Sequence, residues 1–339
     1  MIYRSKVPLR ISFSGGGTDV PPYPEEKGGA VLSTTIDKFA YGSLQPREDS
    51  QIHIHSLDLR IISKYSSVND IAYNGEQDLA KAAIKFVQNA KGDLSKGCDL
   101  YLYTDAKPGS GLGSSSALMV AAITVLCDWQ NITLTDYEVA EAAYVLERKE
   151  LGIPGGIQDQ YSATFGGFNF IEFNKNGVLV TPLRIKNYIL NELHFHLLLC
   201  FTGKTSFHAN IVKNQSASVV NKETAVMNAL DIIKEMTYKM KEHLLRGETD
   251  EFGRMLHEAW VAKKNLNSAI SDSFIDNLYN IGRVKGALGG KILGAGGGGY
   301  LLFYCPAEKK LEIANALQKE GGEISSFSFE RDGFQTWRI

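Results

Sequence analysis

The spacing of apolar and polar positions divides the chain into predicted strands and helices. Residues 52–56 alternate apolar and polar side chains, as a half-buried strand does, and residues 98–104 form a second predicted strand. Apolar residues at helical spacing predict a helix over 76–90. A capping box that begins at Thr135 predicts another helix, which continues to about Leu151. The first half is therefore expected to mix strands with helices.

The second half has longer helical patterns. Residues 195–201 are predicted to form a buried strand, and helical spacing extends over about 209–246 and again over 250–265. Two further strands are predicted over 300–304 and 323–330, with a helix between them. No run of proline, serine and glycine typical of a linker separates the halves. We therefore expect two tightly packed α+β domains, 1–185 and 186–339.

Composition narrows the classes of protein and partner. The 339 residues are 44% hydrophobic and 22% charged, as in a globular protein large enough for two cores. The net charge of −2 argues against nucleic acid as a partner, because a nucleic-acid binder needs a basic face. The sequence has no apolar run long enough to span a membrane and no signal-peptide core. The four cysteines show no CxxC spacing, so we expect reduced, buried thiols and a cytoplasmic location. They are Cys98, Cys127, Cys200 and Cys305.

The segment 108–117, with the sequence PGSGLGSSSA, carries the strongest chemical signal. Its glycines let the backbone approach a ligand closely, and its serines directly precede the apolar helical run 118–129. Free N–H groups and the helix dipole attract an anion at such a helix start. The spacing matches neither the Walker pattern nor the dinucleotide fingerprint. We predict a phosphate site, and a glycine-serine loop that binds nothing is the alternative.

Four other features are ambiguous when each is taken alone. The segment Arg10–Asp19 suits either a polyol ligand or a tight hairpin. Asp159 follows the glycine-rich segment 152–156 and is a candidate general base. Glu147 lies in a charge run that is typical of a solvated helix face. Gly294–Gly299 indicates either a close backbone approach or a turn.

Taken in order, these segments resemble the three motifs of the GHMP kinases, a superfamily named for galactokinase, homoserine kinase, mevalonate kinase and phosphomevalonate kinase. The matching segments are Pro8–Asp19, Pro108–Ala117 and Ile292–Tyr300, so the resemblance spans nearly the whole chain. The sequence GGGTD at 15–19 and the segment Gly155–Tyr161 are similar to the sugar-1-kinase branch that contains D-glycero-D-manno-heptose 7-phosphate kinases.

This resemblance implies a two-lobed α+β fold. The N-terminal lobe would be similar to domain 2 of ribosomal protein S5, and the C-terminal lobe would be ferredoxin-like. The implied reaction is ATP- and Mg²⁺-dependent phosphorylation of the anomeric hydroxyl of D-glycero-D-manno-heptose 7-phosphate. The alternatives are a kinase for L-fucose or a hexose, a decarboxylase of the same fold, and a non-catalytic sugar or ATP sensor. A homodimer is also left open.

The resemblance also implies roles for single residues around ATP. Ser115 and Glu147 would hold Mg²⁺ with hard oxygen ligands. Asp159 would accept the proton of the attacking hydroxyl or orient it, and Arg10 would offset charge on the phosphoryl oxygens. The 294–299 glycines would close over the site. Backbone N–H groups would cradle the ATP phosphates along the loop Pro108, Gly109, Ser110, Gly111, Leu112, Gly113, Ser114 and Ser115.

A second set of residues would bind the acceptor sugar. An acceptor that already carries a phosphate needs a further cation, and the stretch Thr202–His208 offers Lys204, with Lys213 beyond it. A solvated loop lysine is the alternative for Lys204. The residues expected to bind sugar hydroxyls are Gly16, Gly17, Thr18, Asp19 and Gly156.

Two pairs of histidines, His53 with His55 and His194 with His196, would each share one face of a strand. No third ligand at metal spacing accompanies them in the sequence. Structural roles are therefore favoured over zinc binding.

Overall fold

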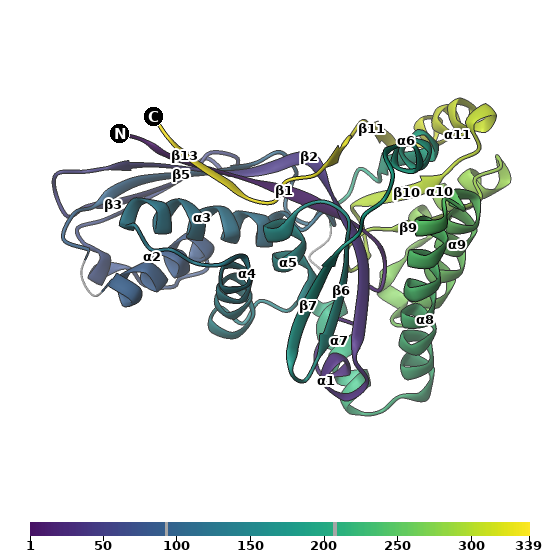
Figure 1. Ribbon diagram of the computed structural model, residues 1–339, viewed down its shortest axis with the longest axis horizontal. Helices are drawn as coiled ribbons and strands as arrows, with labels where there is room; N and C mark the ends of the chain where they lie inside the picture. The colour runs from purple at the N-terminus through teal and green to yellow at the C-terminus, as the bar shows by residue number, and fades with distance from the viewer. Residues whose placement is uncertain (92–93, 206–208) are drawn as a thin grey trace.

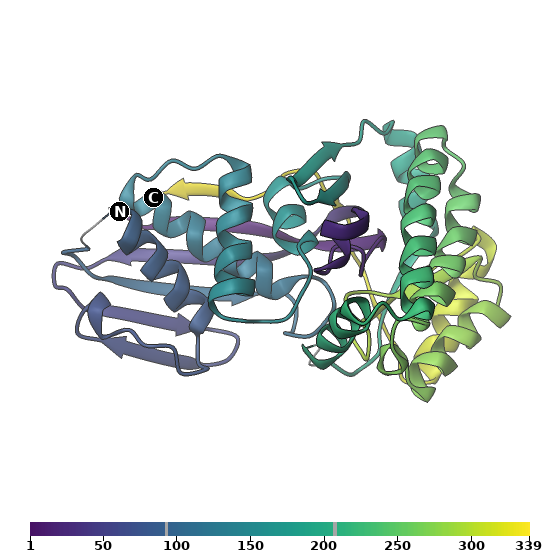
Figure 2. The same cartoon turned by 90° about the horizontal axis from the view of Figure 1, so that it is seen from below.

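The computed structural model describes residues 1–91, 94–205 and 209–339, which form two packed units (Figure 1 and Figure 2). The N-terminal unit is built on a nine-stranded sheet. Its long central strand β2 (Gly29–Pro46) pairs along most of its length with β1 (Tyr3–Ser14). The main strand order is β13 (Gln335–Arg338), β1, β2, β5 (Cys98–Thr104), β3 (Ile52–Ser56) and β4 (Ile61–Tyr65).

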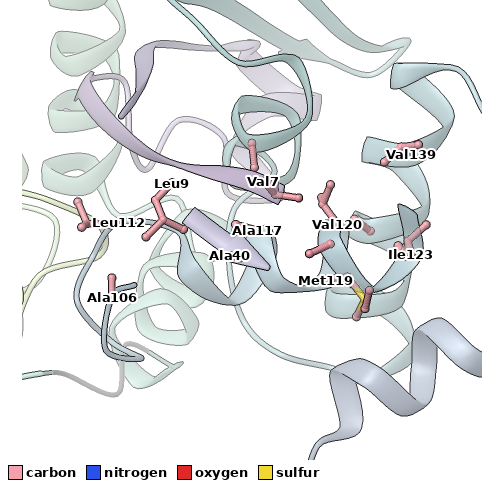
Figure 3. Close-up of a cluster of buried hydrophobic side chains, with 14 of the residues drawn as sticks. Val7, Leu9, Ala40, Ala106, Leu112, Ala117, Met119, Val120, Ile123 and Val139 are labelled. Atoms are coloured by element: carbon pink, nitrogen blue, oxygen red, sulfur yellow. The ribbon is translucent and has the colours of Figure 1, made fainter. Parts of the chain in front are cut away.

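Helices cover one face of this sheet, the lower face in Figure 1. They are α2 (Asp78–Lys91), α3 (Ser114–Gln130), α4 (Asp136–Tyr144) and α5 (Gln158–Phe165). Helix α3 is apolar nearly all round because it lies between the sheet and its neighbouring helices, and Figure 3 shows Val120 and Ile123 in this core. The rigid packing fixes the first turn of α3, which follows the glycine loop.

The hairpin of β6 (Asn169–Asn174) and β7 (Gly177–Pro182) extends the N-terminal sheet from β2. The C-terminal unit has a four-stranded antiparallel sheet in the order β11 (Glu323–Ser325), β8 (Leu197–Phe201), β10 (Tyr300–Tyr304) and β9 (Gly289–Ile292). Its helices are α6 (Asn187–His196), α7 (Ala209–Val220), α8 (Thr224–Arg246), α9 (Thr249–Lys264), α10 (Ser273–Val284) and α11 (Ala307–Lys319). The short helix α1 (Tyr23–Lys27) follows the first glycine cluster.

Several predicted elements are confirmed, and three are corrected. The strands at 52–56 and 98–104 have the predicted bounds. The single helix predicted over 209–246 is two helices, because the chain turns between α7 and α8, where Lys222 has a φ of 52°. The strand predicted from 195 begins at Leu197, because α6 continues to His196.

The strand predicted over 323–330 is two strands in different sheets. Its first part is β11, which pairs with β8, and its second part is β12 (Phe329–Glu330), which pairs with β2 of the N-terminal sheet. The chain then continues into β13, beside β1. The division near residue 185 stays a prediction, and residues 329–338 return to the N-terminal sheet.

The thiols confirm the prediction of free, buried cysteines. All four are unpaired and buried, and burial raises the pKa of each to about 12. Among the described residues, no helix is both long and apolar enough to cross a membrane.

The histidine pairs form hydrogen bonds and ion pairs. His53 Nδ1 lies 2.7 Å from Asp99 Oδ1, so β5 supplies a third group that was not visible in the sequence. The Arg47 guanidinium lies 3.2 Å from the same carboxylate, so the three groups form an ion-pair network. His194 and His196 end α6 rather than lie on a strand, and they contact the backbone carbonyls of Phe327 and Cys305.

Candidate active site

A cavity of about 400 Å³ lies between the two units. The N-terminal unit lines it with the glycine loop, the first turn of α3 and residues around Asp19 and Asp159. The C-terminal unit contributes residues from α7, α9 and the glycine segment after β9. The three glycine-containing segments of the sequence therefore meet at one place.

The glycine loop gives the cavity an anion-binding wall. Gly109, Gly111 and Gly113 all have positive φ, with values of 76°, 83° and 74°, and Gly113 is the N-cap of α3. In this described segment no side chain caps the helix, so its first N–H groups remain available to a ligand. The loop residues that line the cavity are Pro108, Gly109, Gly111, Gly113, Ser114 and Ser115, whereas Ser110 and Leu112 are buried outside its lining.

Substitution of Gly111 by alanine should weaken nucleotide binding. A Cβ there would lie 2.6 Å from Leu293 O, and the φ of 83° adds backbone strain of about 1–3 kcal/mol. We expect ATP affinity, measured by calorimetry, to fall at least about 10-fold. Gly75→Ala is the matched control, because Gly75 has a φ of 89° but open space around its Cβ position. Equal ATP affinities for the two variants would contradict the assigned loop.

Arg10 and Asp159 form an ion pair at the edge of the cavity. Strand β1 places Arg10, and the first turn of α5 places Asp159. Arg10 Nε and Nη2 lie 2.8 and 2.7 Å from Asp159 Oδ1, and Nη1 donates to Gly111 O. Because both side-chain contacts fall on Oδ1, Oδ2 remains for a hydroxyl of an acceptor. Arg10 thus links the carboxylate directly to the glycine loop.

Glu147 is buried, which overturns its reading as a solvated helix position. The residues after α4 form a π-helix (Val145–Glu150), and Glu147 within it is 1% exposed. Its carboxylate accepts hydrogen bonds of 2.6 Å from Ser115 Oγ, Ser116 Oγ and Gln160 Nε2. A hydroxyl and a carboxylate in contact beside the phosphate loop suit Mg²⁺, which prefers oxygen ligands.

Asp19 lines the cavity and also ties two loops together. It accepts hydrogen bonds of 3.0 Å from Gly17 N, Gln158 N and Gln158 Nε2. Burial, and then the nearby Asp159, raise its pKa above the usual value. Gly156 packs directly on it, since a Cβ at Gly156 would lie 1.9 Å from Asp19 Oδ2. Gly16, Gly17 and Gly156 line the same part of the cavity.

Two residues expected at the sugar site lie outside the cavity lining. Thr18 Oγ1 is buried and donates to the carbonyls of Gly15 and Ala30. Lys204 is 62% exposed, and its Nζ lies 3.8 Å from Asp272. Lys213 is also exposed, on α7. The stretch predicted around Lys204 includes residues 206–208, which lie outside the described residues.

Sequence reasoning missed three polar residues of the site. Arg148 lies 3.1 Å from Glu147 Oε1 and donates to Gly156 O at 3.1 Å. Gln160 supports Glu147, and the buried Lys263 of α9 lines the cavity and donates to Gly294 O. Arg148 lies in the charge run 147–150, and Lys263 is followed by Lys264, which is typical of exposed helix positions. Lys263 differs from its neighbour Lys264 because it lines the cavity between the two units, and the sequence does not show this.

Comparisons with known proteins find similar sequences and structures over most of the chain. The family model described as "GHMP kinases N terminal domain" matches residues 78–167, and "GHMP kinases C terminal" matches residues 240–323. The chain is 37% identical to D-glycero-alpha-D-manno-heptose 7-phosphate kinase of Campylobacter jejuni, over 99% of both chains.

Two further proteins are similar. A crystal structure of a D-glycero-D-manno-heptose 1-phosphate kinase from Bacteroides thetaiotaomicron superposes with a TM-score of 0.85 at 33% identity, over 99% of both chains. The L-fucokinase/L-fucose-1-P guanylyltransferase of Bacteroides fragilis is 28% identical over 87% of this chain and 33% of that longer protein.

Proposed function

Because this chain belongs to the GHMP kinases, which are ATP-dependent phosphotransferases with an alcohol group as acceptor, we propose that it phosphorylates the anomeric hydroxyl of D-glycero-D-manno-heptose 7-phosphate. The product would be the 1,7-bisphosphate. The observation that carries this proposal is the position of the Arg10–Asp159 pair, directly beside an uncapped helix start and within a cavity that Asp19 lines. Phosphoryl transfer needs mainly such positioning and charge stabilisation.

In this proposal each part of the cavity has one task. The loop 108–115 would bind the ATP phosphates, and Ser115 and Glu147 would hold Mg²⁺, which would supply positive charge beside the phosphate oxygens. Asp159 accepts the proton of the attacking hydroxyl through Oδ2, or orients that hydroxyl. Arg10 contacts Asp159 and the loop, so it lies where charge on the transferred group is offset.

The choice of acceptor rests on the relatives. Two kinases that are more than 30% identical to this chain are named for a D-glycero-D-manno-heptose phosphate, although their names place the phosphate at different positions. Gly16, Gly17, Asp19 and Gly156 would bind the sugar hydroxyls. Lys204 remains a proposed ligand of the 7-phosphate only if its loop moves toward the cavity when substrate binds.

The test is ADP release from Mg·ATP with a panel of acceptors. The panel contains the heptose 7-phosphate, the heptose 1-phosphate, free heptose, mannose, L-fucose, galactose and mevalonate. We expect kcat/KM for the heptose 7-phosphate to exceed that for free heptose by at least about 100-fold, because an unfilled anion site is costly. Phosphorus NMR of the product should show a new anomeric phosphate. Equal or better turnover of another acceptor would replace this assignment, and no turnover with any of them would favour the sensor.

A further inference from the structure

The charged groups that line the cavity are not all paired. Arg10 forms an ion pair with Asp159, and Arg148 lies 3.1 Å from Glu147. Lys263 also lines the cavity, but it forms no ion pair with a carboxylate in the described part of the chain, and the carboxylate of Asp19 acts on its charge only from beyond ion-pair distance. Burying an ammonium group costs several kcal/mol unless an opposite charge or hydrogen bonds compensate. The described part of the chain therefore gives this cation one hydrogen bond and no direct counter-ion.

Lys263 has unused hydrogen-bonding capacity. Its ammonium group carries three N–H donors, and the one hydrogen bond found for it within the described residues goes to Gly294 O. Burial, and then the positive charge of Arg10, lower the pKa of Lys263 to about 8. An anion in the cavity would take the free donors and restore the charge balance.

A second buried lysine, Lys291, has a structural role and serves as a comparison for Lys263. Lys291 of β9 is buried, and it donates hydrogen bonds of 2.9 and 3.0 Å to the carbonyls of Ser12 and Phe13. It connects the C-terminal sheet to β1 and does not belong to the cavity lining. Lys263, in contrast, donates one hydrogen bond to a carbonyl, where Lys291 donates two, and it lines the cavity.

The surroundings of Lys263 identify the anion. Its partner Gly294 packs directly on the phosphate loop, since a Cβ at Gly294 would lie 2.7 Å from Gly111 Cα. The carbonyl of the same Gly111 accepts a hydrogen bond from Arg10. Lys263 and Arg10 therefore approach the same segment of the loop from the two units, and both line the cavity together with Asp159.

We infer that Lys263 binds an oxygen of the phosphoryl group that ATP transfers, and so acts as a catalytic residue contributed by the C-terminal unit. This inference rests on the proposed function only through its ATP site and does not depend on which acceptor is used. Lys263 would neutralise charge on the transferred group together with Arg10. The nucleotide without that group, ADP, would leave Lys263 without its ligand.

The test compares the Kd of ADP with that of the non-hydrolysable analogue AMPPNP, both with Mg²⁺ and without acceptor, by calorimetry. In Lys263→Met, AMPPNP should bind about 10- to 100-fold more weakly, as loss of a charged hydrogen bond predicts, while ADP affinity stays within about twofold. Lys263→Gln removes the charge but keeps a donor for Gly294 O, and it should behave in the same way. Lys264→Met is the matched control, because Lys264 is the next residue of α9 and lies 3.3 Å from Asp276.

Three outcomes would overturn the inference. Equal weakening of ADP and AMPPNP would show that Lys263 only supports the glycine segment. Unchanged affinities for both nucleotides would show that it binds neither. Unchanged nucleotide affinities with a raised KM for a phosphorylated acceptor would assign it to the acceptor's phosphate instead. Thermal melting of each variant verifies folding, and Lys263→Gln keeps the test usable if Lys263→Met does not fold. Because the ADP and AMPPNP titrations contain no acceptor, failure of the heptose assignment leaves these two affinities unchanged.

Discussion

Replacing Asp159 with asparagine should lower kcat by about 10³-fold and leave ATP affinity nearly unchanged. The amide keeps an oxygen that accepts a hydrogen bond from Arg10, whose contacts of 2.7 and 2.8 Å fall on Oδ1 of the native carboxylate. It cannot take up the proton of an attacking hydroxyl. ATP affinity depends on the loop 108–115, which lies outside the altered group. ADP release under saturating ATP and acceptor measures the loss.

Asp136→Asn is the matched control for this prediction. Asp136 is exposed and lies in the first turn of α4, just as Asp159 lies in the first turn of α5. Both substitutions therefore remove the same favourable interaction with a helix N-terminus. Near wild-type turnover in Asp159→Asn would exclude this carboxylate as the base. A large fall in ATP affinity would point to a role in nucleotide binding.

Glu147→Gln and Ser115→Ala should each raise the Mg²⁺ concentration needed for half-maximal activity, by at least about 10-fold for Glu147→Gln. A neutral amide is a much weaker ligand for Mg²⁺ than a carboxylate. Loss of the hydroxyl of Ser115, which lies 2.6 Å from Glu147 Oε1, removes the other assigned ligand. Activity measured across a Mg²⁺ titration gives the shift.

Two further variants sharpen the Mg²⁺ titration. Glu150→Gln is the control, because Glu150 is an exposed carboxylate of the same π-helix and contacts Tyr73. The Mg²⁺ dependence of this variant should match that of the wild type. Ser116→Ala removes a hydroxyl that also donates to Glu147 but is buried. If Ser116→Ala shifts the titration more than Ser115→Ala, the wrong serine is assigned. If Glu147→Gln leaves the Mg²⁺ concentration for half-maximal activity unchanged, the metal site lies elsewhere.

Local patterns predicted local elements well and long-range pairing poorly. The alternation over 52–56 and the run 98–104 gave strands with the correct bounds, because each pattern lies within one element. The turn at 221–223 lacks glycine and proline, so the break between α7 and α8 has no strong sequence signal. The alternation over 323–330 is real, but it cannot show that the chain changes sheets in its middle.

In the candidate site, too, local features were predicted better than contacts between distant parts of the chain. The glycine segments were visible in the sequence, and the family resemblance assigned Arg10 and Asp159 to one ATP site, where the structure brings them together as an ion pair. The burial of Glu147 was not visible, because a π-helix changes which side of the helix a residue occupies. The roles assigned to these residues stay predictions, as do a homodimer and a cytoplasmic location.

Strand β13 imposes an order on folding during synthesis. Residues 335–338 pair with residues 3–6, and Ile2 and Ile339 exchange backbone hydrogen bonds of 2.8 and 3.0 Å. Figure 1 shows the two ends of the chain side by side. Until residues 335–338 leave the ribosome, β1 is an exposed edge strand that can pair with other chains. Such distant pairing slows folding, so this edge stays open to aggregation for as long as the C-terminal strand is missing.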